Sequence, residues 1–148
     1  MLRRAVDRLL TRAEQREVIG AIAAAESRTS GEIKVHVETR CRGGDALVRT
    51  RALVRRLRLD RAALRNGVLI YVAVHDRKFA VAGDVAVHDR ASQLLWDEVA
   101  RMLGEHFRRG EYRQGLLLAV ARVGDALAAH FPPQPGGDHP VSNRISGR

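Results

Sequence analysis

The sequence predicts an α/β protein, a three-layer α/β/α sandwich in which a small mixed sheet lies between about four helices. Three observations predict this fold. Apolar residues recur at helical spacing in several segments, residues 32–38 alternate between apolar and polar side chains, and residues 68–74 form an uninterrupted apolar run. The 148-residue chain is 45% hydrophobic, which suits one domain that needs no disulfide or metal to fold.

The first half of the chain predicts a helix and two parallel strands. Thr11 and Glu14 form a capping-box pattern, which opens a helix over 11–27, and residues 1–10 are expected to precede it as a short separate helix. The alternation in 32–38 predicts a strand with one wet face, lined by Glu32, Lys34, His36 and Glu38. A helix capped by Asp45 and the strand 68–74 follow, and this crossover makes the two strands parallel.

The second half predicts a hairpin, two helices and a tail. The short polar link 75–78 allows only a hairpin, so a strand over 79–83 should run antiparallel to 68–74. Asp89 is expected to cap a third helix that ends at Arg109-Gly110, and a largely buried fourth helix should span 112–130. All four prolines follow it, so the folded domain is expected over 1–131 and a disordered tail over 132–148.

Positive charge is concentrated in one segment of the sequence. The formal net charge is +9, and most of the excess lies between Arg40 and Arg65. The arginines expected to lie off the apolar face of the helix after Asp45, and so to form a partner-binding surface, are Arg49, Arg51, Arg55, Arg56 and Arg58. An unidentified protein is the expected partner, and nucleic acid or an anionic membrane surface is the alternative partner. The purely structural alternative is a solvated, salt-bridged helix face without a binding role.

Common catalytic signatures are missing from the sequence. There is no P-loop, no dinucleotide fingerprint, no Gly-x-Ser-x-Gly elbow and no HExxH pair, and the single Cys41 cannot form an intrachain disulfide or a structural zinc site. Residues 1–10 lack the apolar core of a secretory signal, and no apolar run approaches the length of a membrane span. A cytoplasmic protein is therefore expected.

An acidic group near the predicted hairpin is the candidate metal site. It comprises Asp76, Asp84, His88 and Asp89, of which Asp84 and Asp89 share one end of the hairpin. Carboxylate oxygens at strand ends suit a hard cation such as calcium. The structural alternative places Asp84 in a turn, Asp89 at a helix cap and His88 in solvent.

Several stretches of the chain, read in order from Ala21 to Phe131, resemble the TPM-domain family. They are Ile22-x-x-Ala25-Glu26-x-x-Thr29-Ser30-Gly31-Glu32-Ile33, then Asn66-Gly67-Val68-Leu69-Ile70-Tyr71-Val72-Ala73, Asp76-Arg77-Lys78, Gly83-Asp84, a helix bearing Trp96, and Phe107-x-x-Gly110-x-Tyr112-x-x-Gly115-Leu116. The resemblance implies a central mixed sheet between helices. It also implies calcium binding, weak acid phosphatase activity, or a part in the repair and assembly of membrane complexes.

The sequence differs from this family at the position where the resemblance implies a bound cation. An acidic residue often precedes Asn-Gly in the family, whereas Arg65 stands here, and only Asp84 and Asp89 remain as ligands. We therefore expect an impaired or absent metal site, no cofactor, and a non-catalytic interaction module that serves protein-complex maintenance or stress tolerance. Two alternatives stay open: a metal-dependent weak acid phosphatase that uses calcium, and a polyanion binder that uses the Arg-rich helix.

Overall fold

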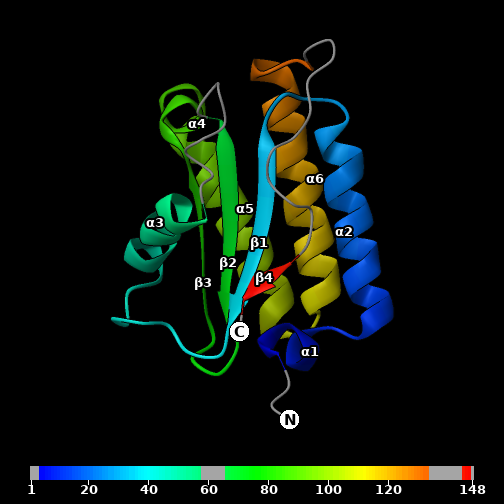
Figure 1. Cartoon of the computed structure of the whole chain (residues 1–148), viewed down its shortest axis with the longest axis vertical. Helices are drawn as coiled ribbons and strands as arrows, with labels where there is room; N and C mark the ends of the chain where they lie inside the picture. Colours follow the sequence, from blue (N-terminus) through cyan, green and yellow to red (C-terminus); the bar gives the residue numbers. More distant parts are fainter. Residues whose placement is uncertain (1–3, 58–65, 134–144, 148) are drawn as a thin grey trace.

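The order of helices and strands along the chain follows the predicted order, with the short helix Val85–Arg90 and the strand Ser146–Gly147 in addition. The computed structural model describes residues 4–57, 66–133 and 145–147. Its elements are shown in Figure 1: α1 (Ala5–Leu9), α2 (Arg12–Glu26), β1 (Glu32–Glu38), α3 (Ala46–Arg56), β2 (Gly67–Ala73), β3 (Lys78–Gly83), α4 (Val85–Arg90), α5 (Gln93–Arg108), α6 (Tyr112–His130) and β4 (Ser146–Gly147).

The four strands form one mixed sheet in the order β3-β2-β1-β4. β1 and β2 are parallel, with Ile33 opposite Val68, and β3 returns antiparallel to β2, with Val81 opposite Ile70. The predicted crossover and hairpin are therefore confirmed. β4 lies parallel to β1 and covers an edge of that strand.

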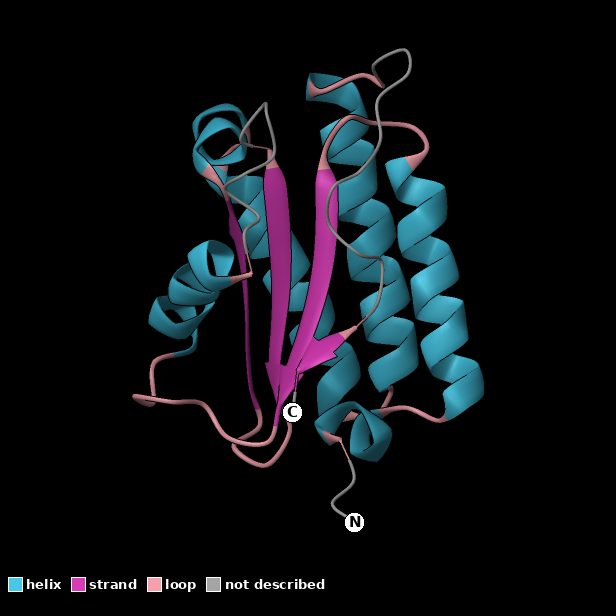
Figure 2. Cartoon of the chain, in the orientation of Figure 1, coloured by secondary structure: helices cyan, strands magenta, loops and turns pink. Residues whose placement is uncertain are grey.

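Helices cover both faces of the sheet, as the predicted three-layer arrangement requires. Figures 1 and 2 show α2, α5 and α6 on one side and α3 on the other. The larger apolar core lies beneath the first group, where Ile22 of α2 and Leu116 of α6 are fully buried with Ile70 of β2. A smaller cluster on the opposite face joins Leu53 of α3 to Tyr71 of β2.

The start of α2 has the predicted capping box. The backbone N–H of Glu14 donates to Thr11 Oγ1 at 3.1 Å, and the backbone N–H of Thr11 donates to Glu14 Oε1 at 2.9 Å. These reciprocal bonds satisfy two N–H groups that the first helical turn would otherwise leave without partners.

The segment after β3 differs from the prediction. Asp84, and not Asp89, opens the next helix, because its carboxylate directly follows the strand and accepts from the backbone N–H of Val85 at 2.8 Å. Asp89 lies inside the short helix α4, and α5 begins separately after Ser92. The expectation that Asp89 caps the third helix was therefore wrong.

The polar face of β1 is buried rather than wet. Glu32 is 1% exposed, Lys34 6% and His36 7%. The prediction of a solvated face rested on alternation alone, and it did not foresee that α3 and β4 bring Arg49 and Ser146 to this face.

The end of the chain also enters the fold. Residues 132–148 were expected to form a disordered tail, yet Ile145 is buried in the larger core and its carbonyl accepts from Arg4 Nη2 at 2.8 Å. Gly147 of β4 has a φ of 133°, a backbone conformation that glycine adopts more readily than other residues. Residues 134–144 lie outside the described part of the chain. Among the described residues, no helix is long and apolar enough to cross a bilayer.

The close packing of α4 against β3 predicts that Gly83 tolerates no side chain. A Cβ at Gly83 would lie 2.9 Å from Val87 Cβ and 3.1 Å from Trp96 Cη2. We expect Gly83→Ala to lower the free energy of unfolding by about 1–3 kcal/mol in urea titrations. The matched control is Gly20→Ala in α2, where a Cβ meets no atom within 4 Å. That substitution should stabilise the fold by about 0.5–1 kcal/mol, and equal effects of the two changes would contradict this packing account.

Candidate functional site

Some of the predicted acidic and basic residues meet in one pocket between α3 and α4. The pocket has a volume of about 450 Å³, and both helices lie at the β3 end of the sheet in Figure 1. Its lining residues are Arg51, Val54, Arg55, Gly83, Asp84, Val85, His88 and Asp89. The pocket therefore combines two guanidinium groups with two carboxylates, an imidazole and apolar surface.

Asp84 is hydrogen-bonded through its carboxylate to the backbone at the start of α4. Its side chain is the helix cap described above, its N–H donates to the Gly67 carbonyl at 2.8 Å, and the residue is only 5% exposed. Asp89 is exposed at the opposite end of α4. The two predicted metal ligands thus line one pocket but sit in different surroundings.

The rest of the predicted metal site does not gather around them. Asp76 lies at the other end of the β2–β3 hairpin, where it accepts from the backbone N–H of Cys41 at 2.7 Å and approaches Arg40 at 3.8 Å. Arg65, expected to repel a cation, lies outside the described residues. Within the ranges that the structure describes, no three His, Cys, Asp or Glu side chains are grouped so as to hold a metal ion.

The predicted arginine surface divides into exposed and buried parts. Arg51, Arg55 and Arg56 are exposed on α3, and none of them forms an ion pair with a described residue. Arg49 instead points inward, with its side chain 12% exposed. Arg58 lies outside the described residues. Three of the five predicted residues therefore form the exposed part, which we call the α3 arginine face (Arg51, Arg55 and Arg56).

Arg49 is held by the carboxylate of Glu38 at the end of β1. Arg49 donates from Nε at 3.2 Å and also from Nη2, and the Tyr71 hydroxyl donates to the same carboxylate at 2.8 Å. Burial opposes ionisation, but the hydrogen bonds from Arg49, Tyr71 and His36 outweigh it and lower the pKa of Glu38 to about 2. Glu38 is therefore an anion at neutral pH that is fully engaged with its neighbours.

His36 connects this carboxylate to the end of the chain. Its Nε2 lies 3.1 Å from Glu38 Oε1, and its Nδ1 lies 2.8 Å from Ser146 Oγ. Burial lowers the pKa of His36, although the hydrogen bond with Glu38 opposes that shift. A neutral ring that donates from Nε2 to Glu38 accepts at Nδ1 from the Ser146 hydroxyl. This network therefore fastens β4 to β1.

A pair of carboxyl groups lies near the amino end of β1. Glu26 is buried at the end of α2 and accepts from the backbone N–H of Ile33 at 2.8 Å. Burial, together with the charge of the neighbouring Glu26 and a hydrogen bond to it, raises the pKa of Glu32 well above its ordinary value. The pair therefore retains a proton at neutral pH. Sequence reasoning missed this pair because the two residues belong to different elements and Glu32 was placed on a wet face.

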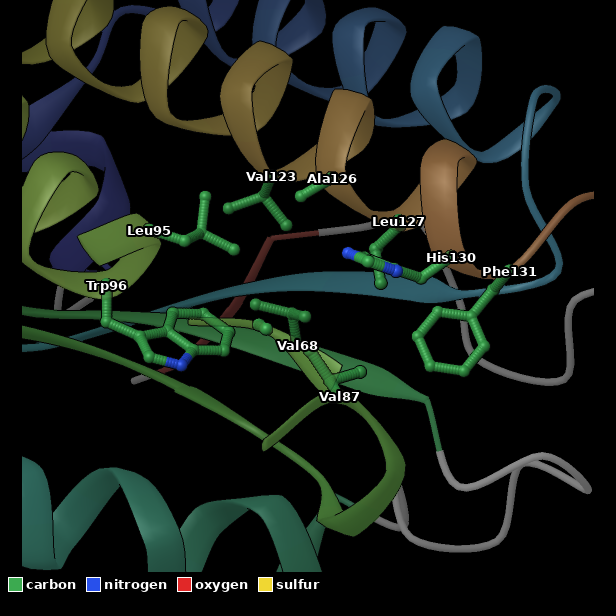
Figure 3. Close-up of a pocket in the computed structure, with 10 residues that line it drawn as sticks. Val68, Val87, Leu95, Trp96, Val123, Ala126, Leu127, His130 and Phe131 are labelled. Atoms are coloured by element: carbon green, nitrogen blue, oxygen red, sulfur yellow. The ribbon is translucent and has the colours of Figure 1, made fainter. Parts of the chain in front are cut away.

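A second pocket beside α4 is a packing void. Figure 3 shows side chains from β2, α4, α5 and α6 converging on it, among them Val68, Val87, Trp96 and Leu127. Its volume is about 10 Å³, close to the minimum needed for one water molecule, and its walls are apolar. The void therefore belongs to the core that holds α4 in place, and it is too small for a ligand.

The shared proton at Glu32 predicts a pH dependence of stability. A carboxyl whose pKa is higher in the folded state than its ordinary 4.5 stabilises the fold below that value, and this contribution is lost as the pH rises toward the raised pKa. Thermal unfolding should therefore show the stability falling between about pH 7 and pH 9.

The substitution Glu32→Gln, which mimics the protonated carboxyl, should flatten this dependence. Its control is Glu105→Gln at an exposed position of α5, which should leave the slope as in the wild type. An unchanged slope in Glu32→Gln would show that the proton is not held there.

Comparison with solved structures agrees with the fold. The NMR structure of the BA42 protein from the psychrophilic bacterium Bizionia argentinensis has a TM-score of 0.86 with this chain, over 94% of this chain and 95% of that one. The two sequences are 37% identical. The N-terminal domain of cg2496 from Corynebacterium glutamicum is 12% identical, with a TM-score of 0.64 over 88% of this chain and 84% of that one. The N-terminal domain of a protein from P. gingivalis is 22% identical, with a TM-score of 0.60 over 83% of this chain and 79% of that one.

These latter two likenesses concern the fold alone. No curated protein matches the chain. A family model described as the TPM domain matches residues 5–126, which include α1 to most of α6 and every residue of the α3–α4 pocket. The chain therefore belongs to the TPM-domain family.

Proposed function

We propose that this TPM domain is a non-catalytic interaction module that binds an acidic protein segment through the α3 arginine face, in protein-complex maintenance or stress tolerance. The observation that carries the proposal is the state of the arginines. Arg51, Arg55 and Arg56 are exposed without an ion pair to any described residue, while Arg49 on the same helix is paired. Unpaired guanidinium groups on one surface attract and orient carboxylates.

Apolar side chains beside these arginines favour a protein partner over a simple polyanion. Val48 on α3 is 64% exposed and Val85 on α4 is 56% exposed. Val48, Arg51, Ala52 and Arg55 all lie on the outward side of α3, opposite the buried Leu53 and Val54. A segment that carries both carboxylates and apolar side chains would complement this surface, as acidic amphipathic helices do in basic grooves.

The carboxylates of the pocket support binding rather than metal-dependent catalysis. A calcium site needs about six to eight oxygen ligands, and the carboxylate of Asp84 is already engaged as a helix cap. Two guanidinium groups line the same pocket and oppose a cation electrostatically. An impaired or absent metal site and no resident cofactor are parts of this proposal.

One prediction of this proposal concerns the exposed arginines of α3. A fluorescein-labelled peptide of about 15 residues that mixes Glu and Asp with Leu and Phe should bind the protein, as measured by fluorescence anisotropy. The double substitution Arg51→Gln/Arg55→Gln should weaken binding by about three- to tenfold, since each exposed charge contact contributes modestly. The matched control, Arg16→Gln/Arg101→Gln, removes two exposed arginines elsewhere and should leave the affinity unchanged.

Nucleic acid provides the contrast that decides the kind of partner. A single-stranded oligonucleotide of equal net charge should bind more weakly than the peptide, because it cannot use Val48 and Val85. Tighter binding of the oligonucleotide, with a steep loss of affinity in salt, would favour the polyanion alternative. Equal loss of peptide binding in both double variants would remove the α3 arginine face from the proposal.

A second prediction concerns metal and phosphatase activity. Calcium or magnesium below about 1 mM should not change the melting temperature, and p-nitrophenyl phosphate should be hydrolysed no faster than in the protein-free blank. Asp84→Asn retains a capping side chain and should behave as the wild type does. Metal-dependent hydrolysis that is abolished by a chelator and by Asp84→Asn would contradict the proposal and favour the phosphatase alternative.

A further inference from the structure

We propose that a third pocket, at the carboxyl end of β2, binds a small organic anion with an apolar, ring-containing body. The pocket lies between the β2–β3 turn, the end of α5 and the start of α6, and its volume is about 500 Å³. Ligand pockets commonly have volumes of about 300–1,000 Å³, so this one is of the size that encloses a small molecule.

One wall of this pocket is aromatic. The rings of Phe79 and Phe107 meet edge to face with centroids 5.6 Å apart, and those of Phe107 and Tyr112 meet at 5.2 Å. All three rings line the pocket and are only half-buried, with Val72 beside them. Such a wall offers apolar surface and ring edges to a flat or branched hydrocarbon body.

The other side of the pocket is cationic. Arg77, Lys78 and Arg108 line it, and no Asp or Glu is among its lining residues. The Lys78 ammonium donates to the Gly44 carbonyl, whereas Arg77 and Arg108 form no ion pair with any described residue. The two arginines without an ion pair, beside an apolar wall, select an anion and disfavour a cation, since like charges at close range cost free energy.

The backbone presents Arg77 at some energetic cost. Arg77 has a φ of 53°, in the left-handed region, and among the described residues it is the only one other than glycine with a positive φ. This conformation costs an arginine about 1 kcal/mol relative to a glycine or asparagine. The turn thus retains a strained arginine among the residues that line the pocket.

The position in the sheet also favours a ligand site. β1 and β2 are parallel, and ligands of open α/β sheets bind beyond the carboxyl ends of such strands. The α3–α4 pocket lies at the opposite end of the β2–β3 hairpin, where Gly83 pairs with Val68. The proposed anion site is therefore separate from the α3 arginine face and does not depend on the function proposed for that face.

Two dyes that differ in one charged group test the ligand class. The anionic probe is 8-anilinonaphthalene-1-sulfonate, and N-phenyl-1-naphthylamine has the same rings without the sulfonate. The wild type should bind the sulfonate at one site with a gain in fluorescence, and the neutral dye at least about tenfold more weakly. In ¹⁵N–¹H spectra, the sulfonate should shift the amides of Phe79, Gly104, Phe107 and Tyr112.

Three variants separate the contributions of charge and shape. Arg77→Gln/Arg108→Gln should weaken sulfonate binding by about tenfold or more and leave the neutral dye unaffected. Arg16→Gln/Arg101→Gln is the control for net charge and should change neither dye. Gly104→Leu should block both dyes, because a Cβ at Gly104 faces Phe79 Cζ at 3.4 Å and a longer side chain would extend into the pocket.

The proposal would be overturned if Arg77→Gln/Arg108→Gln bound the sulfonate as the wild type does. It would also be overturned if the amide shifts centred on Arg51 and His88, because the dye would then occupy the α3–α4 pocket. The acidic peptide tests only the α3 arginine face. If that peptide fails to bind, the result says nothing about sulfonate binding in the third pocket, so the two proposals can fail separately.

Discussion

The arrangement of side chains between α3 and the sheet depends on one constraint, which is that the Glu38 carboxylate must have hydrogen-bond partners. A buried carboxylate must be paired and hydrogen-bonded, and Glu38 obtains its partners from three elements: Arg49 of α3, Tyr71 of β2 and His36 of β1. At roughly 100° per residue, Arg51 and Arg55 lie about 200° and 240° around the helix from Arg49. A helix that directs Arg49 to Glu38 and buries Leu53 therefore directs Arg51 and Arg55 away from the sheet.

The two ends of the sheet have different chemistry. At the amino ends of β1 and β2, the Asp84 carboxylate caps α4, Glu26 and Glu32 share a proton, and two arginines of α3 border the nearby pocket. At the carboxyl ends, the charges are mainly positive and aromatic rings lie beside them. The two proposed binding sites, one for an acidic segment and one for a small anion, therefore lie at different ends of the sheet and can be tested by separate substitutions.

Most of the fold could be predicted from local patterns. The capping box at Thr11, the apolar run of β2 and the short link before β3 depend on neighbouring residues, and they indicated the right elements and strand directions. The burial of the polar face of β1 could not be predicted, because it depends on Arg49 and on Ser146, which is 110 residues from His36. The cap was assigned to Asp89 from the apolar pattern that follows it, whereas the carboxylate of Asp84, directly after β3, caps the short helix α4.

Asp84, Asp89, Arg51 and Arg55, which the sequence singled out, line the α3–α4 pocket. The sequence pattern indicated Asp89 instead of Asp84 as the helix cap, and it treated Arg49 as equivalent to Arg51 and Arg55. The distinction depends on which arginine reaches Glu38, a contact between elements that periodicity does not encode. The aromatic and cationic pocket at the other end had no sequence signal, because Phe79, Phe107 and Tyr112 come together only through the packing of β3, α5 and α6.

The most direct test of the central claim is an NMR titration that follows the arginine Nε–Hε signals as the acidic peptide is added. If Glu38 holds Arg49 and thereby exposes its neighbours, the Arg49 signal should be protected from solvent exchange and remain in place, while the Arg51 and Arg55 signals shift together to saturation. An Arg49 signal that exchanges and shifts like the others, or Arg51 and Arg55 signals that do not respond, would contradict the account.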